Sequence, residues 1–237
     1  AILRHLQSNQ VFLVPLDEQG HWFRYHHLFS DLLRARPPLT VPQASLHLRA
    51  CRWFSAQGLL HEAVEQALFA GQPDVAASLV QGLSEEQLLA EQNVSMLLRW
   101  KMDLPDSLLS STPRLIMIYS WALMLACQLD AAEDLAAQLE RFLPAPTASA
   151  QQDLLARWLA LSGVIARGRG QVTRAEQYSV EALASLAPEH YGLRLMCLST
   201  LANLAVVQGD LWRARGFNRE GLDLAQRIGN PLFEGLA

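Results

Sequence analysis

The chain has 237 residues, of which 51% are hydrophobic and 18% are charged, and this composition favours a buried core over disorder. The formal net charge is -4 at pH 7, so the chain has no excess of basic residues with which to bind nucleic acid by releasing counterions. Lys101 is the only lysine and follows Trp100 in an apolar segment instead of a glycine-rich turn, which excludes a phosphate-binding P-loop and ATP hydrolysis by this chain.

Residues 1–36 are predicted to be the end of a winged-helix domain. Val11–Pro15 and Trp22–Tyr25 are rich in the apolar and aromatic residues of short strands, and Asp17–Gly20 lies between them as a turn. A helix is expected from His26 to Arg36, where two prolines end it. The order strand, turn, strand and helix is typical of the wing of a winged-helix domain.

Residues 42–112 are predicted to form an arm of short helices. Apolar stripes with helical spacing end at Gly58 and at Gly71, and glycine is the preferred residue just after a helix. Pro73 suits the first turn of the next helix, and Pro105 separates two later ones.

Residues 113–237 are predicted to form a regular array of helix hairpins. Small residues recur in pairs at one spacing, as in tetratricopeptide (TPR) repeats, where they let two antiparallel helices approach closely. Because a single hairpin cannot bury both of its faces, the hairpins must stack. The expected fold class is therefore all-α, a TPR-like right-handed α-solenoid of antiparallel helix pairs with a short winged-helix remnant at the N-terminus. An irregular α-bundle with accidental spacing is the alternative. The pairs are Ser120 with Ala132, Gly163 with Ala175, and Ala202 with Ala214.

The segment Leu115–Cys127 is apolar on all sides and too short for the roughly 20 residues of a membrane span. We therefore expect it to be covered on every face where the arm meets the first hairpin. In particular, Ile116, Leu123 and Met124 should be buried.

Somewhat more than half of the chain resembles the MalT-like, LuxR-type transcriptional regulators of the STAND ATPase class. The most specific stretch is Trp22–Arg34, which is similar to the segment that closes the winged-helix domain of these regulators. The resemblance covers about residues 10–145, and the remainder is similar only as generic repeats. Further matching stretches are Leu46–Phe54, Gly58–Val64, Ala67–Gly71, and Arg99–Trp100 ahead of Leu104–Pro105.

The resemblance implies an internal piece of a large cytoplasmic activator that has an ATPase domain before this segment and a DNA-binding helix-turn-helix after it. The piece would be the sensor and oligomerisation module, with a small-molecule inducer or a regulatory protein as partner and self-association in the active parent protein. ATP or ADP would bind the parent protein, and this segment would hold no cofactor, touch no membrane and catalyse no reaction. A free-standing TPR-like scaffold that binds protein segments is the alternative function.

His26 is the one residue to which the resemblance gives a nucleotide-related role. Tyr25-His26-His27 resembles the Met-His-Asp motif of related STAND ATPases, whose histidine contacts the β-phosphate of bound ADP. An imidazole N–H can donate to phosphate. The second position is His instead of Asp, so a purely structural role at the strand–helix junction stays open.

Metal-binding and catalytic motifs are not expected. His21, His26, His27 and Asp31 lack the spacing of a metal site. No serine, cysteine or carboxylate has a supporting catalytic motif around it.

A candidate effector groove follows from laying the TPR pattern on the three small-residue pairs, because the first helix of each hairpin lines the concave side. The groove would combine cations with aromatic and polarizable groups and suit an anionic or amphiphilic ligand or an acidic peptide. Arg157 and Arg167 should point into it, and replacing both with alanine should leave thermal stability nearly unchanged. The alternative is that Trp121 and the methionines simply pack between helices. The proposed site residues are Arg114, Trp121, Arg157, Arg167 and Asn203, with Met117, Met124, Val164, Met196 and Ser199 on the same side.

Two residue types are expected mainly in the core. Cys51, Cys127 and Cys197 are widely spaced in apolar stretches, which favours buried thiols in a reducing compartment. Tryptophans on apolar helical stripes are usually packing residues. They are Trp53, Trp100, Trp121 and Trp158.

Overall fold

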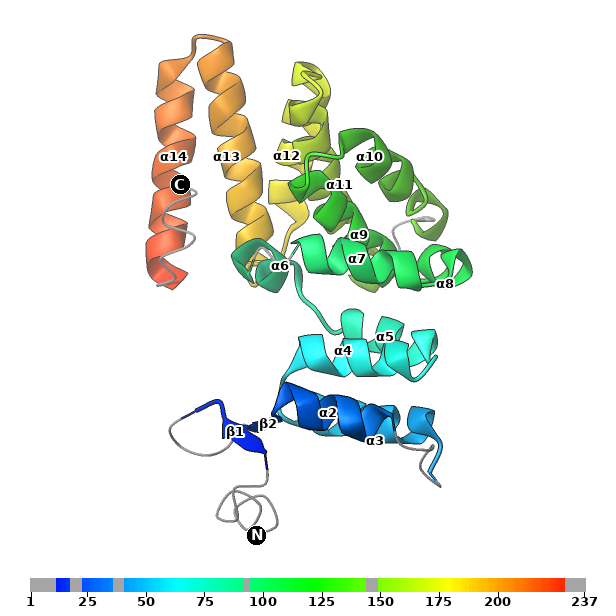
Figure 1. Cartoon of the computed structure of the whole chain (residues 1–237). Coiled ribbons are helices and arrows are strands. Elements are labelled where there is room, and N and C mark those ends of the chain that lie inside the picture. The colour runs from blue at the N-terminus through cyan, green and yellow to red at the C-terminus, as the bar shows by residue number, and fades with distance from the viewer. Residues whose placement is uncertain (1–11, 18–22, 36–40, 92–93, 144–148, 229–237) are drawn as a thin grey trace. The chain divides into compact units, whose positions relative to one another are not determined.

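The structure is a computed structural model, and it describes residues 12–17, 23–35, 41–91, 94–143 and 149–228. The chain forms two compact units, residues 1–46 and residues 47–237. Helices dominate the described residues, and a sheet of two short strands accompanies them (Figure 1). The all-α fold class is confirmed.

The first unit contains the predicted strands and helix. Strands β1 (Leu13–Pro15) and β2 (Phe23–Tyr25) pair antiparallel, and helix α2 (His27–Arg34) follows. The ring of Phe29 on α2 stacks on Phe12 with centroids 5.2 Å apart, which packs the helix against the residue ahead of β1. Strand β1 and helix α2 begin later than predicted, and the predicted start of the second strand, Trp22, lies outside the described residues. The expected turn lies largely outside the described residues, as does the predicted helix end at Arg36.

The arm begins within the first unit and continues into the second as six short helices. Gly58 and Gly71 have φ angles of +72° and +68°, the left-handed conformation that glycine adopts most readily, and each follows a helix as predicted. Pro73 and Pro113 stand in the first turns of α5 and α9, and Pro105 is the N-cap of α8. The helices are α3 (Gln43–Ala56), α4 (Leu60–Phe69), α5 (Pro73–Val80), α6 (Glu85–Glu91), α7 (Val94–Asp103) and α8 (Asp106–Ser111).

The array consists of three helix hairpins in the second unit, as predicted. The last of them, α13 with α14, is seen most clearly as two long antiparallel helices joined by a tight turn (Figure 1). The hairpins are α9 (Pro113–Leu125) with α10 (Leu129–Ala137), α11 (Ser149–Gly168) with α12 (Val172–Ser185), and α13 (Tyr191–Val207) with α14 (Leu211–Ile228).

The small residues are buried, but one predicted pairing is wrong. A Cβ on Gly163 would lie 2.7 Å from the hydroxyl oxygen of Ser179, so Gly163 faces Ser179 across the hairpin and not Ala175. Ala175 packs in a cluster with Ala166 instead. The reason is geometric, since in an antiparallel hairpin residues equally far from the turn lie opposite each other. Glycine suits position 163 because a Cβ there would press on the Ser179 hydroxyl and come within 3.3 Å of the Ser179 backbone nitrogen.

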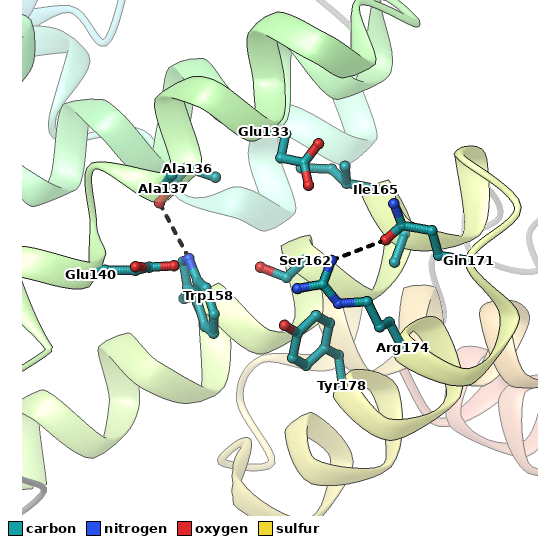
Figure 2. Close-up of a pocket in the computed structure, with 11 residues that line it drawn as sticks. Glu133, Ala136, Ala137, Glu140, Trp158, Ser162, Ile165, Gln171, Arg174 and Tyr178 are labelled. Atoms are coloured by element: carbon teal, nitrogen blue, oxygen red, sulfur yellow. Dashed lines mark hydrogen bonds between the residues drawn. The ribbon is translucent and has the colours of Figure 1, made fainter.

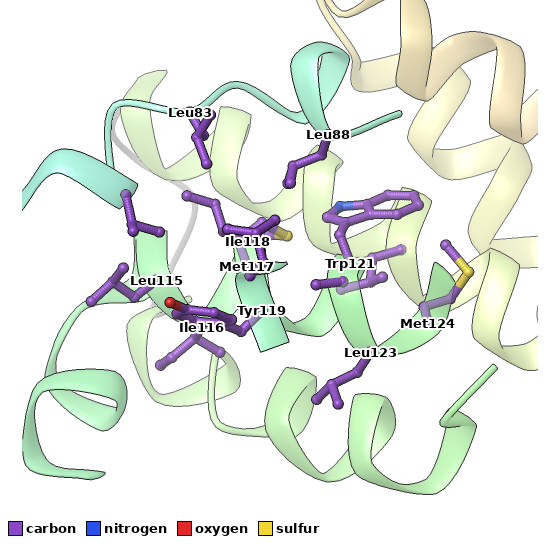
Figure 3. Packing of buried hydrophobic residues seen from close by; sticks show 14 of the residues in the cluster. Leu83, Leu88, Leu115, Ile116, Met117, Ile118, Tyr119, Trp121, Leu123 and Met124 are labelled. Atoms are coloured by element: carbon purple, nitrogen blue, oxygen red, sulfur yellow. The ribbon is translucent and has the colours of Figure 1, made fainter. Parts of the chain in front are cut away.

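Helix α9 is the centre of the core. Every residue from Leu115 to Met124 is buried, which confirms the burial predicted for Ile116, Leu123 and Met124. Leu83 and Leu88, from the arm, lie over the same cluster (Figure 3). The arm and the first hairpin therefore share one core. None of the described helices is long and apolar enough to cross a membrane.

Two of the expected core residues are not in the core. Trp53 on α3 is 52% exposed, because it lies on a face that the other helices leave uncovered. Cys127 is exposed, because it belongs to the turn after α9 and not to the helix. Trp100 and Trp121 are buried, Trp158 is half-buried, and Cys51 and Cys197 are buried as predicted.

Candidate functional site

His26 lies at the junction between β2 and α2. Its backbone N–H donates to the carbonyl oxygen of Phe12 at 2.7 Å, and its own carbonyl accepts from the first amides of the helix, at Phe29 and Ser30. The imidazole ring lies 4.3 Å from that of His27. His26 thus has a structural role through its backbone, while its ring borders a shallow hollow with Val14 and Arg24.

Three of the predicted effector residues on the first hairpin, Met117, Trp121 and Met124, are buried in the core. Trp121 and Met117 have no exposed surface, and Met124 is 8% exposed (Figure 3). For these residues the packing interpretation holds. An effector could not reach Trp121 without opening the core.

Arg114 and Arg157 meet at one buried carboxylate, which belongs to Glu85. Arg114 on α9 donates to both carboxylate oxygens of Glu85 at 3.1 Å, and Arg157 on α11 donates through Nε at 3.1 Å and also through Nη2. The Glu85 side chain is 2% exposed. Burial of Arg157 opposes its charged form, but the carboxylates of Glu85 and Asp153 together outweigh this effect and raise the guanidinium pKa above its ordinary value.

These contacts correct one expectation from the sequence. Arg157 is 9% exposed and supplies one of the two guanidinium groups that hold Glu85, so replacing it with alanine leaves this buried carboxylate with Arg114 alone and should cost stability. Arg114 also donates from Nε to the backbone carbonyl of Gln81 at 3.3 Å, which ties the arm to α9. Both arginines therefore act first as structural residues.

A second part of the cluster extends to the third hairpin. Asp153 accepts from Arg157 at 3.2 Å, and its other oxygen lies 2.6 Å from Nε2 of His190, the N-cap residue of α13. Nδ1 of His190 lies 3.8 Å from a buried oxygen of Glu86 that has no hydrogen-bond partner among the described residues. We call Glu85, Glu86, Arg114, Arg157, Asp153 and His190 the charge cluster. It links α6 of the arm to all three hairpins.

The other two predicted groove residues are more accessible. Asn203 is exposed on α13, and its amide donates to the backbone carbonyl of Ser199 at 2.8 Å. Arg167 is half-buried, with an Nε that has no hydrogen-bond partner in the described part of the chain. Effector binding at these residues stays a prediction.

A pocket that the sequence did not suggest lies between the first two hairpins (Figure 2). It has a volume of about 110 Å³ and is lined by α10, α11, α12 and the short 3₁₀ helix η1 (Glu140–Phe142) that follows α10. The indole N–H of Trp158 donates to the carbonyl of Ala136 at 3.2 Å, and the ring meets Tyr178 edge to face at 5.8 Å. These two rings form its apolar wall.

Polar groups surround that wall. Glu133 accepts from Nε of Arg169 at 2.8 Å, whereas the carboxylate of Glu140 has no ion pair or hydrogen bond to a described residue. The guanidinium of Arg174 makes one hydrogen bond to a described residue, a long one of 3.4 Å to the side chain of Gln171. The hydroxyl groups of Ser162 and Tyr178 likewise have no partner among the residues that the structure describes. The pocket thus offers donors and acceptors for a ligand.

The described residues contain no group of three or more His, Cys, Asp or Glu side chains placed to hold a metal ion. His21, one of the four residues considered from the sequence, lies outside the described residues.

Comparison with known proteins supports the resemblance found in the sequence. A family model described as the MalT winged helix domain matches residues 1–45. The HTH-type transcriptional regulator MalT of Klebsiella pneumoniae is 28% identical over 233 residues, which are 95% of this chain and 25% of that protein. MalT of Yersinia pestis is 25% identical over 228 residues, with the same coverage. The similarity to MalT-like regulators is therefore confirmed over nearly the whole chain.

A second kind of relative matches part of the chain more strongly. The serine/threonine-protein kinase PknK of Mycobacterium tuberculosis is 38% identical over 125 residues, 52% of this chain and 11% of that protein. The chain thus spans about a quarter of the MalT relatives and about a tenth of this kinase. No solved structure matches the chain.

Proposed function

We propose that this chain, a segment similar to MalT-like regulators, is the arm and sensor module of an ATP-dependent transcriptional activator of the LuxR type. The helical array would bind an effector or a regulatory protein, and the arm would connect it to a STAND-type ATPase domain. The active parent protein would self-associate in the cytoplasm. The chain itself would be no enzyme and would not bind DNA.

The observation that carries this proposal is the similarity to MalT along 95% of the chain, which takes in both the winged-helix segment and the array. A free-standing TPR-like scaffold would not need a winged-helix segment, so this alternative is weaker. Stacked helix hairpins expose extended surfaces that suit partner binding.

The charge cluster supports a role in transmitting a signal. Glu85 belongs to the arm, and the arginines that hold it belong to the first and second hairpins. If those hairpins changed their stacking, the contacts of Arg114 and Arg157 with Glu85 would change, and this buried carboxylate needs a positive partner. Binding to the array would in this way reach the arm.

The kinase relative favours a second candidate function. Its 38% identity exceeds that of the MalT relatives, although it covers only about half of the chain. The same helical module could thus regulate a protein kinase in place of a DNA-binding domain. The residues on either side of this segment in its intact protein would distinguish the two outputs.

The proposal is tested in the intact protein with His26→Ala, and with His27→Ala as the matched control. If His26 contacts bound nucleotide, its loss should lower ADP retention and raise basal transcription from a reporter promoter, while the neighbouring histidine has a smaller effect. Retention is measured by nucleotide analysis of the purified protein. Unchanged retention together with unchanged basal transcription would remove the nucleotide-sensing role.

A further inference from the structure

We propose that the pocket between α10, α11 and α12 binds a small zwitterion, a molecule with an ammonium group and an acid group a few bonds apart. The inference goes beyond the proposed function and rests on it only for the interpretation of binding as a signal.

The charges that line the pocket balance in a way that favours a zwitterion over a simple cation or anion. Glu133 is already neutralised by Arg169. Glu140 and Arg174 then remain, one negative and one positive, and neither has an ion pair among the described residues. A ligand that compensates both must carry both charges.

The two charges belong to different sides of the pocket. Glu140 lies beside Trp158, whereas the guanidinium of Arg174 extends between Ser162 and Tyr178 (Figure 2). An ammonium group next to Trp158 would form an ion pair with the Glu140 carboxylate and a cation–π contact with the face of the indole. An acid group on the other side would accept from Arg174 and from the two hydroxyl groups, in charge-assisted hydrogen bonds.

The wall of the pocket is held in place before any ligand binds. The hydrogen bond from Trp158 to Ala136 sets the tilt of the indole, and the edge-to-face contact with Tyr178 sets the second ring. A fixed aromatic wall costs little ordering entropy on binding. Its apolar surface suits the short hydrocarbon part of the ligand.

The size of the pocket limits the ligand. The volume of about 110 Å³ lies well below the roughly 300–1,000 Å³ of pockets that bury a drug-sized ligand. A free amino acid or a compound of similar size meets this limit, and an oligosaccharide or a peptide segment does not.

The test is isothermal titration of the full chain with each of the twenty proteinogenic L-amino acids, glycine betaine and taurine as probes. For the tightest binder, the matched amine without the acid group and the matched acid without the amine are titrated next. We expect saturable binding of at least one zwitterion, and at least about tenfold weaker binding of both single-charge analogues. Binding of no probe, or equal binding of a single-charge analogue, would overturn the proposal.

Variants place the binding in this pocket. Arg174→Gln and Glu140→Gln should each weaken binding about tenfold or more, whereas Arg215→Gln and Asp134→Asn, at exposed positions outside the pocket, should leave it unchanged. Circular dichroism confirms that each variant is folded. Equal loss in the control variants would contradict the assignment. Binding to the chain is measured without transcription. A pocket that binds no zwitterion would therefore leave the regulatory function untouched, and a failed transcription test would leave the zwitterion site untouched.

Discussion

Glu85 is the residue on which the interior electrostatics depend. A carboxylate that is 2% exposed is stable there because two guanidinium groups donate to it from different helices. A surface ion pair contributes little, but removing one partner of a buried pair leaves the other charge uncompensated. Because Glu85 is buried, the fold needs Arg114 and Arg157 beside it.

Glu85→Gln should accordingly lower the free energy of unfolding by about 3–5 kcal/mol, because Arg114 would lose its counterion and Arg157 would keep only the half-exposed Asp153. Urea denaturation followed by circular dichroism measures the loss. Asp134→Asn, which removes an exposed carboxylate, is the control and should stay within about 0.5 kcal/mol of the unchanged chain. A loss as small as the control's would mean that the cluster is not a structural requirement.

The three cysteines should differ sharply in reactivity. Burial raises the pKa of the Cys197 thiol to about 12 from 9.0, and burial also raises that of Cys51. The thiolate is the reactive form, so both thiols should be inert in the folded chain at neutral to mildly alkaline pH. With Ellman's reagent we expect one fast equivalent, from exposed Cys127, and the other two only after denaturation. Cys127→Ser should abolish the fast phase, and a fast phase that persists in it would contradict this assignment.

The same raised pKa predicts a pH dependence of stability. The folded chain holds the Cys197 proton more tightly than the unfolded chain does. The protonated thiol therefore makes its full contribution to the free energy of unfolding below pH 9.0, and this contribution declines as the pH rises towards about 12. Burial raises the pKa of the Tyr119 hydroxyl as well, which acts in the same direction.

At the scale of elements, the hairpins share one kind of turn, with one exception. The turns after α11 and α13 place Gly170 and Gly209 at φ angles of +72° and +79°, whereas the turn after α9 places Cys127 at +58°. The amide of Gln128 donates to the carbonyl of Leu123 and that of Cys127 to Met124, the two bonds of a Schellman motif. A non-glycine residue in this conformation costs roughly 1–2 kcal/mol.

Cys127→Gly should therefore stabilise the chain, by about 0.5–1 kcal/mol after the greater backbone entropy of unfolded glycine is counted. Gly209→Ala is the opposite change at the equivalent turn and should destabilise it by a similar amount or more. Thermal unfolding of both variants measures the difference. If the two substitutions shift the melting temperature in the same direction, the turn conformation assigned to Cys127 is wrong.

At the scale of the whole molecule, the main buried cluster of the described residues runs from Cys51 on α3 to Ala225 on α14, beside a small second one around Ala175. Because the arm and the array share this core, neither can rearrange without changing how the other packs. A module with a shared core can pass a structural change from the array to the arm, which separately folded units joined by linkers could not do.

The chain by itself should neither hydrolyse ATP nor bind DNA specifically. Its one lysine, Lys101, lies in helix α7, outside any glycine-rich loop, and its net charge is -4. Phosphate release and fluorescence anisotropy with a labelled duplex are the measurements, each at physiological salt. ATP turnover that survives Lys101→Ala and repurification would show a nucleotide site independent of this lysine, and sequence-selective anisotropy changes would contradict the absence of DNA binding.

The sequence by itself determined the all-α class, the winged-helix start, most helix ends and the burial of α9, because glycine, proline and apolar periodicity act locally. It also identified the family resemblance, through the stretch from Trp22 to Arg34. Only the tertiary structure decided which charges meet. Glu85 is far from Arg157 in sequence and has no local signal, so its burial and its pairing follow from how α6, α9 and α11 pack. The pocket likewise exists only where two hairpins stack, and the pairing of Gly163 with Ser179 depends on where the turn centres the hairpin. Spacing along one helix determines which residues share a face, but not which neighbour covers that face.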